Sequence, residues 1–197
     1  MFEALTAEMY ERMRVLEAID ERDRQDGTAY DERLRQVQPD TGRFLAILAA
    51  NTPPGEIVEI GTSAGYSTIW LSLAARVRGG RVVTYERLAA KASMARETFA
   101  LTGVEEWVQL VEDDATRHLS GHGAIAFCFL DANKEVYEHC WDLVSERIVP
   151  GGLLVADNTL SHRDGLIDML EKAKADPRFD VVEVPIDKGE LLCRRRE

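Results

Sequence analysis

The sequence predicts an α/β fold in which one mostly parallel sheet is covered by helices on both faces. Two observations lead to this prediction. Short apolar runs alternate with helical patterns from residue 57 onward, and residues 125–131 stay apolar until the last position. Such alternation is typical of parallel sheets, whose central strands are buried on both sides. Because the 197 residues contain no internal repeat or linker, we expect one domain over residues 1–197, with an N-terminal helical extension over about 1–50.

The N-terminal extension is expected to hold two helices. Apolar residues at three- and four-residue steps predict an amphipathic helix that packs on the body or on a partner chain: Phe2, Leu5, Met9, Met13, Leu16 and Ile19. Residues 21–32 are polar and predict a loop or a broken helix. A second helix is expected to begin at Pro39 and to end at Thr52-Pro53-Pro54-Gly55, with a buried side made by Phe44, Leu45, Ile47 and Leu48.

Strands and helices then alternate along the chain. The expected strands are residues 57–60, 81–86, 107–112, 125–131 and 153–157. The expected helices are residues 67–75, 88–101, 136–148 and 164–174. Residues 179–186 and 191–195 predict a closing hairpin around Asp187-Lys188-Gly189, which adds an antiparallel strand.

Composition restricts the classes of partner. The formal net charge is −11, from 35 acidic and 24 basic residues, which argues against nucleic-acid binding because that binding depends on Lys and Arg. No apolar stretch approaches the roughly 20 residues that span a bilayer, and the acidic N-terminus does not resemble a signal peptide. The three scattered cysteines indicate buried thiols in a reducing compartment, so we expect no membrane association and a cytoplasmic location.

A glycine turn follows the first expected strand, at the edge where open α/β sheets bind ligands. Gly61 and Gly65 allow the backbone to turn tightly and to approach a ligand. Ser63 stands at the position of the middle glycine of a dinucleotide fingerprint, and the glycine spacing also differs from that pattern. The turn therefore favours a smaller ligand that has no pyrophosphate.

Acidic residues at successive strand ends narrow the ligand further. Glu59 lies on the first strand, where burial is costly unless the carboxylate meets a cation such as an amino-acid ammonium, directly or through a water. Glu86 ends the second strand, where a carboxylate can accept hydrogen bonds from ribose hydroxyls. Asp114-Ala115 follows the third strand and is placed to flank an adenine. Together these positions predict S-adenosylmethionine as the ligand.

Oxygen ligands gather at the next two strand ends. Asp131 ends the fourth strand, and Asp157-Asn158 ends the fifth. If these two strands are neighbours, their ends lie roughly 4.8 Å apart, and two carboxylates and an amide can converge on one cation. This donor set suits a hard ion such as Mg²⁺, Ca²⁺ or Mn²⁺ and not zinc. About three coordination positions would stay open, which favours an acceptor with vicinal hydroxyls, such as a catechol.

A phenolic acceptor must lose its proton before it is methylated. Full ionisation of a phenol with a pKa near 10 costs on the order of 4 kcal/mol at pH 7, and a divalent ion can supply that stabilisation. Lys134, one turn beyond Asp131, is a candidate proton acceptor if its pKa is lowered by burial and by the metal. Asp131 and Lys134 are therefore the candidate catalytic residues.

These motifs resemble the cation-dependent O-methyltransferase family that includes caffeoyl-CoA and catechol O-methyltransferases. The similar segments are Glu59-Ile60-Gly61 with Gly65-Tyr66-Ser67, Phe129-Leu130-Asp131-Ala132-Asn133-Lys134 with Tyr137, and Asp157-Asn158-Thr159-Leu160. The resemblance implies a Rossmann-like fold with a seven-stranded sheet of order 3-2-1-4-5-7-6, and it implies a homodimer. Asn133 replaces the usual second aspartate, and His162 stands where plant members tend to have a substrate-contacting asparagine, so their acyl-CoA substrate is not carried over.

The resemblance also implies roles for individual residues. Contacts with S-adenosylmethionine are implied for Val37, Glu59, Gly61, Thr62, Ser67, Glu86, Ala115 and Asp131. Metal ligands are implied at Asp131, Asp157 and Asn158, with Lys134 near the acceptor oxygen.

The leading hypothesis is therefore metal-assisted O-methylation of a small catechol-type phenol. Three alternatives stay open at this point. One is methylation of a tRNA nucleoside, which the acidic charge disfavours. Another is a nicotinamide-dependent oxidoreductase, which the missing middle glycine disfavours. The last is a ligand-binding domain without catalytic activity.

Overall fold

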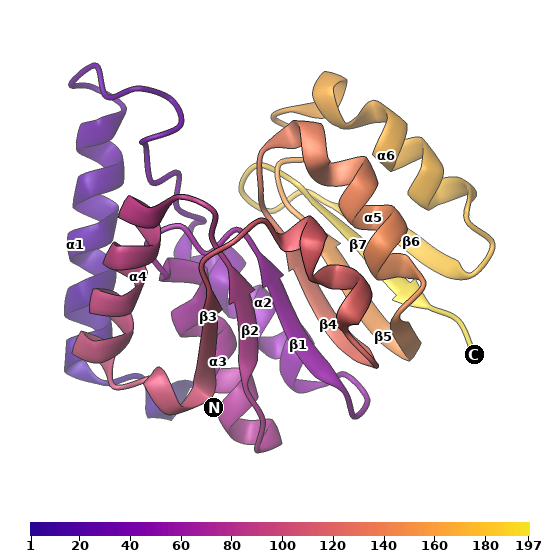
Figure 1. The fold of residues 1–197 in the computed structure, drawn as a ribbon, viewed down its shortest axis with the longest axis horizontal. Helices are drawn as coiled ribbons and strands as arrows, with labels where there is room; N and C mark the ends of the chain where they lie inside the picture. Colours follow the sequence, from indigo (N-terminus) through magenta and orange to yellow (C-terminus); the bar gives the residue numbers. More distant parts are fainter.

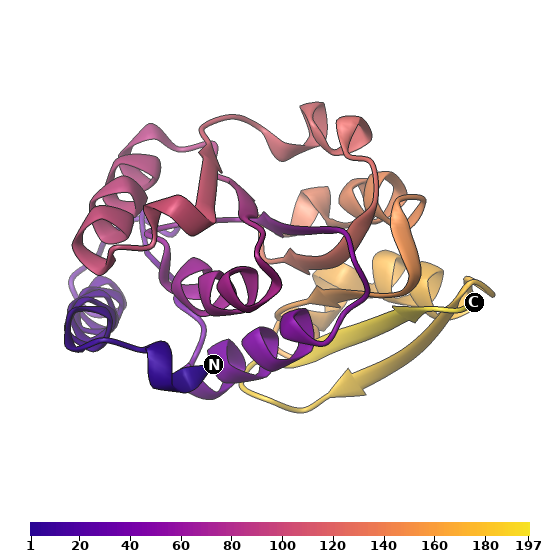
Figure 2. The same ribbon diagram turned by 90° about the horizontal axis from the view of Figure 1, so that it is seen from below.

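The computed structural model describes residues 1–197 as a seven-stranded sheet between two layers of helices (Figure 1). The strand order is β3-β2-β1-β4-β5-β7-β6, which confirms the expected topology. One apolar cluster joins the first four helices to one face of the sheet, and a second cluster joins α5 and α6 to the other face. Seen from below, the helices lie on opposite sides of the strands (Figure 2).

The N-terminal extension packs on its own chain. Helix α1 (Ala7–Asp23) lies against α4 and α3, so its apolar stripe is covered without a partner chain. A single 3₁₀ turn, Phe2–Ala4, precedes it, and the expected continuous helix from Phe2 is wrong. The interruption has a local cause: Thr6 is extended, and its hydroxyl accepts a hydrogen bond from the Met9 N–H, which caps α1.

Helix α2 (Pro39–Ala50) packs on α3, which confirms the second expected helix. Leu45 is fully buried, whereas the expected burial of Ile47 is wrong, since this residue is 48% exposed. The close contact between α2 and α3 explains which side of α2 faces inward. A Cβ at Gly42 would lie 2.3 Å from the Trp70 ring, so the Gly42 side of the helix is pressed against α3.

The parallel half of the sheet follows the expected alternation. Its strands are β1 (Glu56–Ile60), β2 (Val82–Tyr85), β3 (Val108–Val111) and β4 (Ile125–Leu130). Helices α3 (Tyr66–Arg78) and α4 (Ala89–Thr102) connect the first three. Every residue of β4 is buried, as its uninterrupted apolar sequence predicts.

Strand β5 (Ile148–Ala156) is longer than expected, and helix α5 (Tyr137–Ser145) is shorter. The expected helix end and strand start around residues 148–153 are therefore wrong. Ile125 pairs with Ile148, but Phe127 pairs with Leu153, so β5 carries extra residues at this point. Gly151 adopts a φ of 76°, which lets the strand make this irregular passage.

The C-terminal part consists of α6 (Arg163–Ala175) and an antiparallel hairpin of β6 (Phe179–Val184) and β7 (Glu190–Arg195). Strand β7 pairs with β5, which confirms the expected antiparallel addition. All three cysteines are buried and free, as expected. None of the helices combines the length and apolar character that crossing a bilayer requires.

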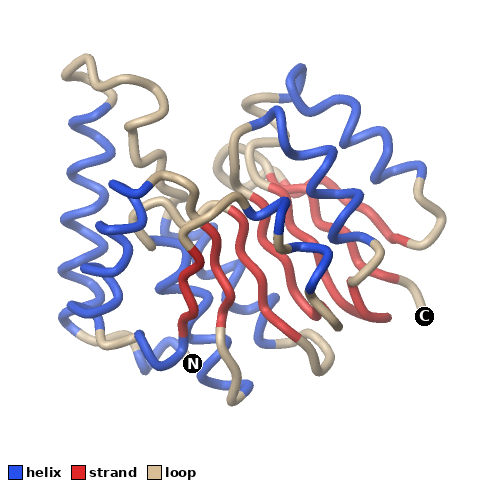
Figure 3. Tube along the Cα trace, in the orientation of Figure 1, coloured by secondary structure: helices blue, strands red, loops and turns tan.

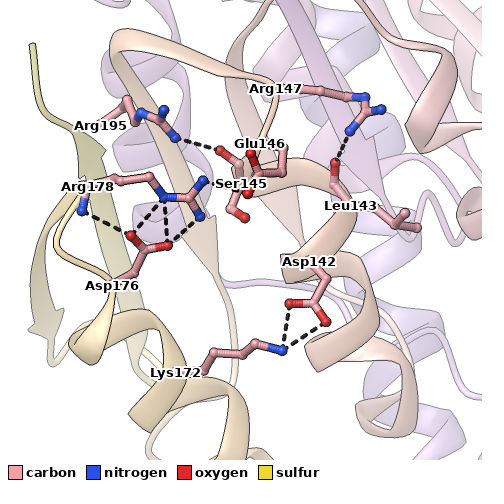
Figure 4. Close-up of polar contacts among 9 residues, drawn as sticks. All are labelled: Asp142, Leu143, Ser145, Glu146, Arg147, Lys172, Asp176, Arg178 and Arg195. Atoms are coloured by element: carbon pink, nitrogen blue, oxygen red, sulfur yellow. Dashed lines mark hydrogen bonds and ion pairs between the residues drawn. The ribbon is translucent and has the colours of Figure 1, made fainter.

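A polar network fastens these C-terminal elements to one another (Figure 4). The guanidinium of Arg178 donates to both carboxylate oxygens of Asp176 and also to Glu146, which follows α5. Lys172 of α6 forms an ion pair with Asp142 of α5. The network holds the loop between α6 and β6 against the end of α5.

Candidate active site

A cavity of about 230 Å³ lies where β1, β2 and β4 end. The loops after these strands gather at the upper edge of the sheet, together with the segment that connects α1 to α2 (Figure 3). Seven of the eight residues expected to contact S-adenosylmethionine line this cavity: Val37, Gly61, Thr62, Ser67, Glu86, Ala115 and Asp131. The structure thus brings together residues that lie far apart in the sequence.

The glycine turn after β1 forms one wall. Gly61 has a φ of 107°, and a Cβ there would lie 1.8 Å from the Asp131 carbonyl oxygen, so no other residue fits without moving β4. The N–H groups of Gly61 and Thr62 both donate to the Tyr85 carbonyl oxygen, at 3.1 and 3.0 Å. These bonds connect the turn to the end of β2 and fix its shape.

Glu59 is the one expected contact that does not line the cavity. Its carboxylate is fully buried and accepts hydrogen bonds from the hydroxyls of Ser67, Thr68 and Thr84. Ser67 lines the cavity, and its hydroxyl lies 2.6 Å from the Glu59 carboxylate. Burial raises the pKa of Glu59 to about 7, although the three hydroxyls act in the opposite direction. Glu59 thus lies behind Ser67 and not at the cavity surface.

Glu86 directly follows the end of β2 and is buried, at 7% exposure. Its two carboxylate oxygens accept from the N–H of Ser63, at 2.8 Å, and from the N–H of Leu88, at 2.9 Å. Each carboxylate oxygen has a second lone pair, so Glu86 keeps acceptor capacity toward the cavity. This position suits the recognition of two neighbouring hydroxyls, as expected for a ribose.

The segment from Arg33 to Val37 covers the cavity, and we call these five residues the strap. The N–H of Arg35 donates to Asp20 of α1 at 2.7 Å, and Lys91 of α4 donates to the Arg33 carbonyl oxygen at 2.8 Å. Only Val37 was expected here, and that expectation came from the resemblance. The strap carries no periodic pattern, and its contacts connect residues far apart in sequence, so sequence reasoning missed it.

The expected metal ligands lie together at the ends of β4 and β5. The side-chain amide of Asn158 donates to Asp131 at 3.0 Å and to Asp157 at 2.8 Å. Asp157 is fully buried, and burial, followed by the Asp131 charge, raises the pKa of Asp157 above its usual range. No group of three or more His, Cys, Asp or Glu side chains is arranged to hold a metal ion, so a site would need Asn158 as its third ligand.

Glu190, at the start of β7, is a buried carboxyl group that the sequence pattern did not mark. Both of its carboxylate oxygens are buried without a hydrogen-bond partner. Burial, and then the charge of Asp157, raise its pKa far above the usual range. Two buried carboxyl groups that repel each other, of which Glu190 has unpartnered oxygens, are the surroundings that a divalent cation would stabilise. The donor set therefore fits a hard cation.

Lys134 lies beside this oxygen cluster. Its Nζ donates to Tyr137 Oη at 2.7 Å and to the Ala132 carbonyl oxygen at 3.2 Å, and it lies 3.5 Å from Asp131. Tyr137 Oη in turn donates to the Asp157 carbonyl oxygen at 3.2 Å. This chain of hydrogen bonds holds the ammonium group at the cavity wall, next to the end of β4.

His162 also lines the cavity, as does Lys188 of the β6–β7 hairpin. Burial lowers the pKa of His162, and the positive charges of Lys134, Lys188 and Arg35 lower it further. His162 is exposed and lies at the rim of the cavity. The end of the cavity near Lys134 is positively charged.

Comparison with known proteins tests the family resemblance independently of the cavity. Residues 16–196 match a family model described as O-methyltransferase. The chain is 34% identical over 146 residues to a catechol O-methyltransferase of Niastella koreensis, a match that covers 72% of this chain and 64% of that protein. It is 26% identical over 181 residues to caffeoyl-CoA O-methyltransferase 2 of Populus trichocarpa, covering 79% of this chain and 73% of that protein.

Solved structures share the fold over nearly the whole chain. The cofactor-bound protein Rv0187 from MTB superposes with a TM-score of 0.80 at 25% identity, covering 95% of this chain and 90% of that one. The O-methyltransferase from Bacillus cereus in complex with SAH gives a TM-score of 0.75 at 24% identity, and the match covers 100% of both chains.

Proposed function

The chain belongs to the O-methyltransferase family, and we propose that it transfers a methyl group from S-adenosylmethionine to a hydroxyl of a small catechol-type phenol with the help of a divalent cation. One observation carries this proposal. A single cavity has the Glu86 carboxylate on one wall and the Asp131, Asn158 and Lys134 side chains on another. A nucleoside and a phenolic oxygen can therefore be held in the same space.

The cofactor wall would bind the donor through groups that the fold already holds in place. Glu86 would accept hydrogen bonds from the ribose hydroxyls, while the backbone of Gly61 and Thr62 allows close approach. Glu59 would act through Ser67, whose hydroxyl bonds to it at 2.6 Å. Ala115, at 7% exposure, lines the same cavity as Glu86 and would flank the adenine.

The acceptor wall would hold the cation and the phenol. Asp131, Asp157 and Asn158 would be its ligands, and a bound divalent cation supplies the positive charge that favours the ionised form of a phenol. Without such help, ionisation at pH 7 costs on the order of 4 kcal/mol. This set of two carboxylates and an amide suits Mg²⁺, Ca²⁺ or Mn²⁺.

Besides the bound cation, Lys134 is the side chain proposed to take part in catalysis. Methyl transfer breaks the carbon–sulfur bond and forms a carbon–oxygen bond, and the hydroxyl proton must leave the acceptor. Lys134 Nζ is the group placed to receive this proton, and its contacts with Tyr137 and Ala132 orient it. The remaining contribution is alignment of the oxygen, methyl and sulfur atoms in one cavity.

Family membership decides against a nicotinamide-dependent oxidoreductase. Transfer to a tRNA nucleoside remains the alternative acceptor within the methyltransferases, and the net charge of −11 disfavours it. The homodimer and the cytoplasmic location stay predictions.

A methyl-transfer assay on catechol tests the proposal. We expect wild-type activity to fall by more than about a hundredfold in excess chelator and to return when Mg²⁺ is added. Asp157→Ala should be as inactive as the chelated enzyme and should not recover. The control is Asp168→Ala, which removes an exposed carboxylate of α6 and should behave as wild type. Activity that responds neither to chelation nor to Asp157→Ala would contradict the role of the metal.

A further inference from the structure

Arg35 of the strap is a guanidinium without an anion. Its Nε is buried and makes no hydrogen bond, and the side chain takes part in no ion pair. Its remaining contacts are weak: Nη2 lies 3.4 Å from the neutral Asn133 side chain, and the guanidinium carbon lies 4.5 Å from the centre of the Tyr30 ring. Because arginine stays charged and an unpaired buried donor is costly, this side chain is suited to an anionic ligand.

The backbone of Arg35 is held in a strained conformation. Its φ is 55°, in the left-handed region that non-glycine residues rarely adopt. Two buried aspartates of α1 impose it: Asp20 accepts from the Arg35 N–H at 2.7 Å, and Asp23 accepts from the Leu34 N–H at 3.3 Å. The hydroxyl of Ser63, in the glycine turn, donates to the Leu34 carbonyl oxygen at 3.0 Å. These hydrogen bonds hold the strained backbone from both sides and fix the position of the Arg35 side chain. Backbone strain of this kind concentrates at ligand-binding sites.

The guanidinium lies at the acceptor end of the cavity. Asn133, its hydrogen-bond partner, directly precedes the proposed catalytic residue Lys134. Lys188 lines the same end and has no ion pair of its own. Asp187, the residue before it, accepts a hydrogen bond from the Gln38 N–H at 3.3 Å, so the hairpin and the strap lie against each other. Two cations without partners, Arg35 and Lys188, thus face the space beside the acceptor hydroxyl.

We propose that the phenolic acceptor carries a carboxylate and that Arg35, assisted by Lys188, binds it. This inference rests on the proposed function, because it names the substrate class of that same site. The guanidinium presents paired N–H donors that match a carboxylate, and the buried Nε would gain the partner it lacks. A carboxylate bound there would orient the ring so that its hydroxyls face Lys134 and the oxygen cluster.

Two acceptors with the same catechol ring provide the test: 3,4-dihydroxybenzoate, which carries a negative charge, and its methyl ester, which replaces that charge with a neutral group. We expect wild-type kcat/KM to favour the carboxylate by about tenfold or more. Arg35→Gln should lower kcat/KM for the carboxylate by about tenfold to a hundredfold, mainly through KM, and should leave the ester within about twofold. The control Arg96→Gln removes an exposed surface cation paired with Glu112 and should change neither.

Binding measurements separate this inference from the proposed function. Calorimetry with dihydroxybenzoate, on protein loaded with adenosylhomocysteine and Mg²⁺, should show weaker binding for Arg35→Gln and also for Lys188→Gln. Affinity for adenosylhomocysteine should not change. Equal losses for carboxylate and ester would overturn the inference, as would a loss of adenosylhomocysteine affinity, which would assign Arg35 to the carboxylate of the donor. If binding depends on the acceptor's charge but no methyl transfer occurs, the carboxylate-binding role of Arg35 is supported and the proposed function is overturned.

Discussion

At the scale of single residues, Glu59 is a buried carboxyl group directly behind the ligand cavity. Three hydroxyls donate to its carboxylate, yet burial still raises its pKa to about 7. The group therefore titrates near neutral pH in the folded chain. An ammonium group brought near by a ligand would favour the charged form.

This pKa predicts a specific pH dependence of stability. The folded state keeps the Glu59 proton up to about pH 7, whereas the unfolded state loses it near 4.5. Between these values the folded state binds more protons, so the free energy of unfolding falls as pH rises, by about 1.4 kcal/mol per pH unit from this group. Glu59→Gln removes the titration, so its urea-derived unfolding free energy should fall less steeply than that of wild type from pH 5 to 7.

The comparison between the two proteins isolates Glu59, because Asp157 contributes with the same sign in both. A matched control is Glu171→Gln, which removes an exposed glutamate of α6 and should leave the wild-type slope unchanged. Identical slopes for wild type and Glu59→Gln would show that Glu59 is ionised throughout this range.

At the scale of elements, the Arg178 network supports the C-terminal half (Figure 4). Arg178 joins Asp176, beyond α6, to Glu146, beyond α5, with N–O distances of 2.6 and 2.5 Å. Asp176 is only 9% exposed in its side chain, which makes this interaction stronger than a surface pair.

Replacing Arg178 should therefore loosen the packing of α5 against α6. We expect Arg178→Met to lower the free energy of unfolding by about 1–2 kcal/mol in urea denaturation. Arg14→Met, which breaks one exposed pair with Glu11, is the comparison and should cost less than about 0.5 kcal/mol. If both variants lose the same small amount of unfolding free energy, the Arg178 network stabilises the protein no more than an exposed ion pair does.

The elements also show what could be predicted from the sequence. Strand β4 was predicted because a strand buried on both faces is apolar throughout, and the hairpin of β6 and β7 because its turn residues are specific. The start of β5 was missed because Pro150 and Gly151 normally interrupt strands, and here they belong to an irregular pairing with β4.

The candidate site was predicted where its residues directly follow strands. Asp131, Asp157 and Asn158 are of this kind, since strand ends meet at one edge of a parallel sheet. Arg35 and Glu190 could not be found in this way. Their environment depends on contacts with Asp20 and Asp157, which lie distant in the chain, and no local pattern encodes such pairs.

At the scale of the whole molecule, the charge of the residues lining the cavity has the opposite sign to the net charge of the chain. The chain carries −11 overall, yet the residues lining the cavity include seven basic and four acidic side chains. Fixed charges that face a small cavity act at short range, where salt and the distant surface have little effect. The acidic exterior and a cavity suited to an anionic acceptor are therefore compatible.

Binding of adenosylhomocysteine, measured by isothermal titration, tests the central claim most directly, namely that this cavity is the donor site. We expect one molecule per chain with a Kd of about 1–100 μM, and about tenfold or more weaker binding for Glu86→Gln, which removes the charged partner of the ribose hydroxyls. NAD should not bind. Binding of NAD in place of adenosylhomocysteine, or adenosylhomocysteine affinity that is the same in Glu86→Gln, would contradict the account.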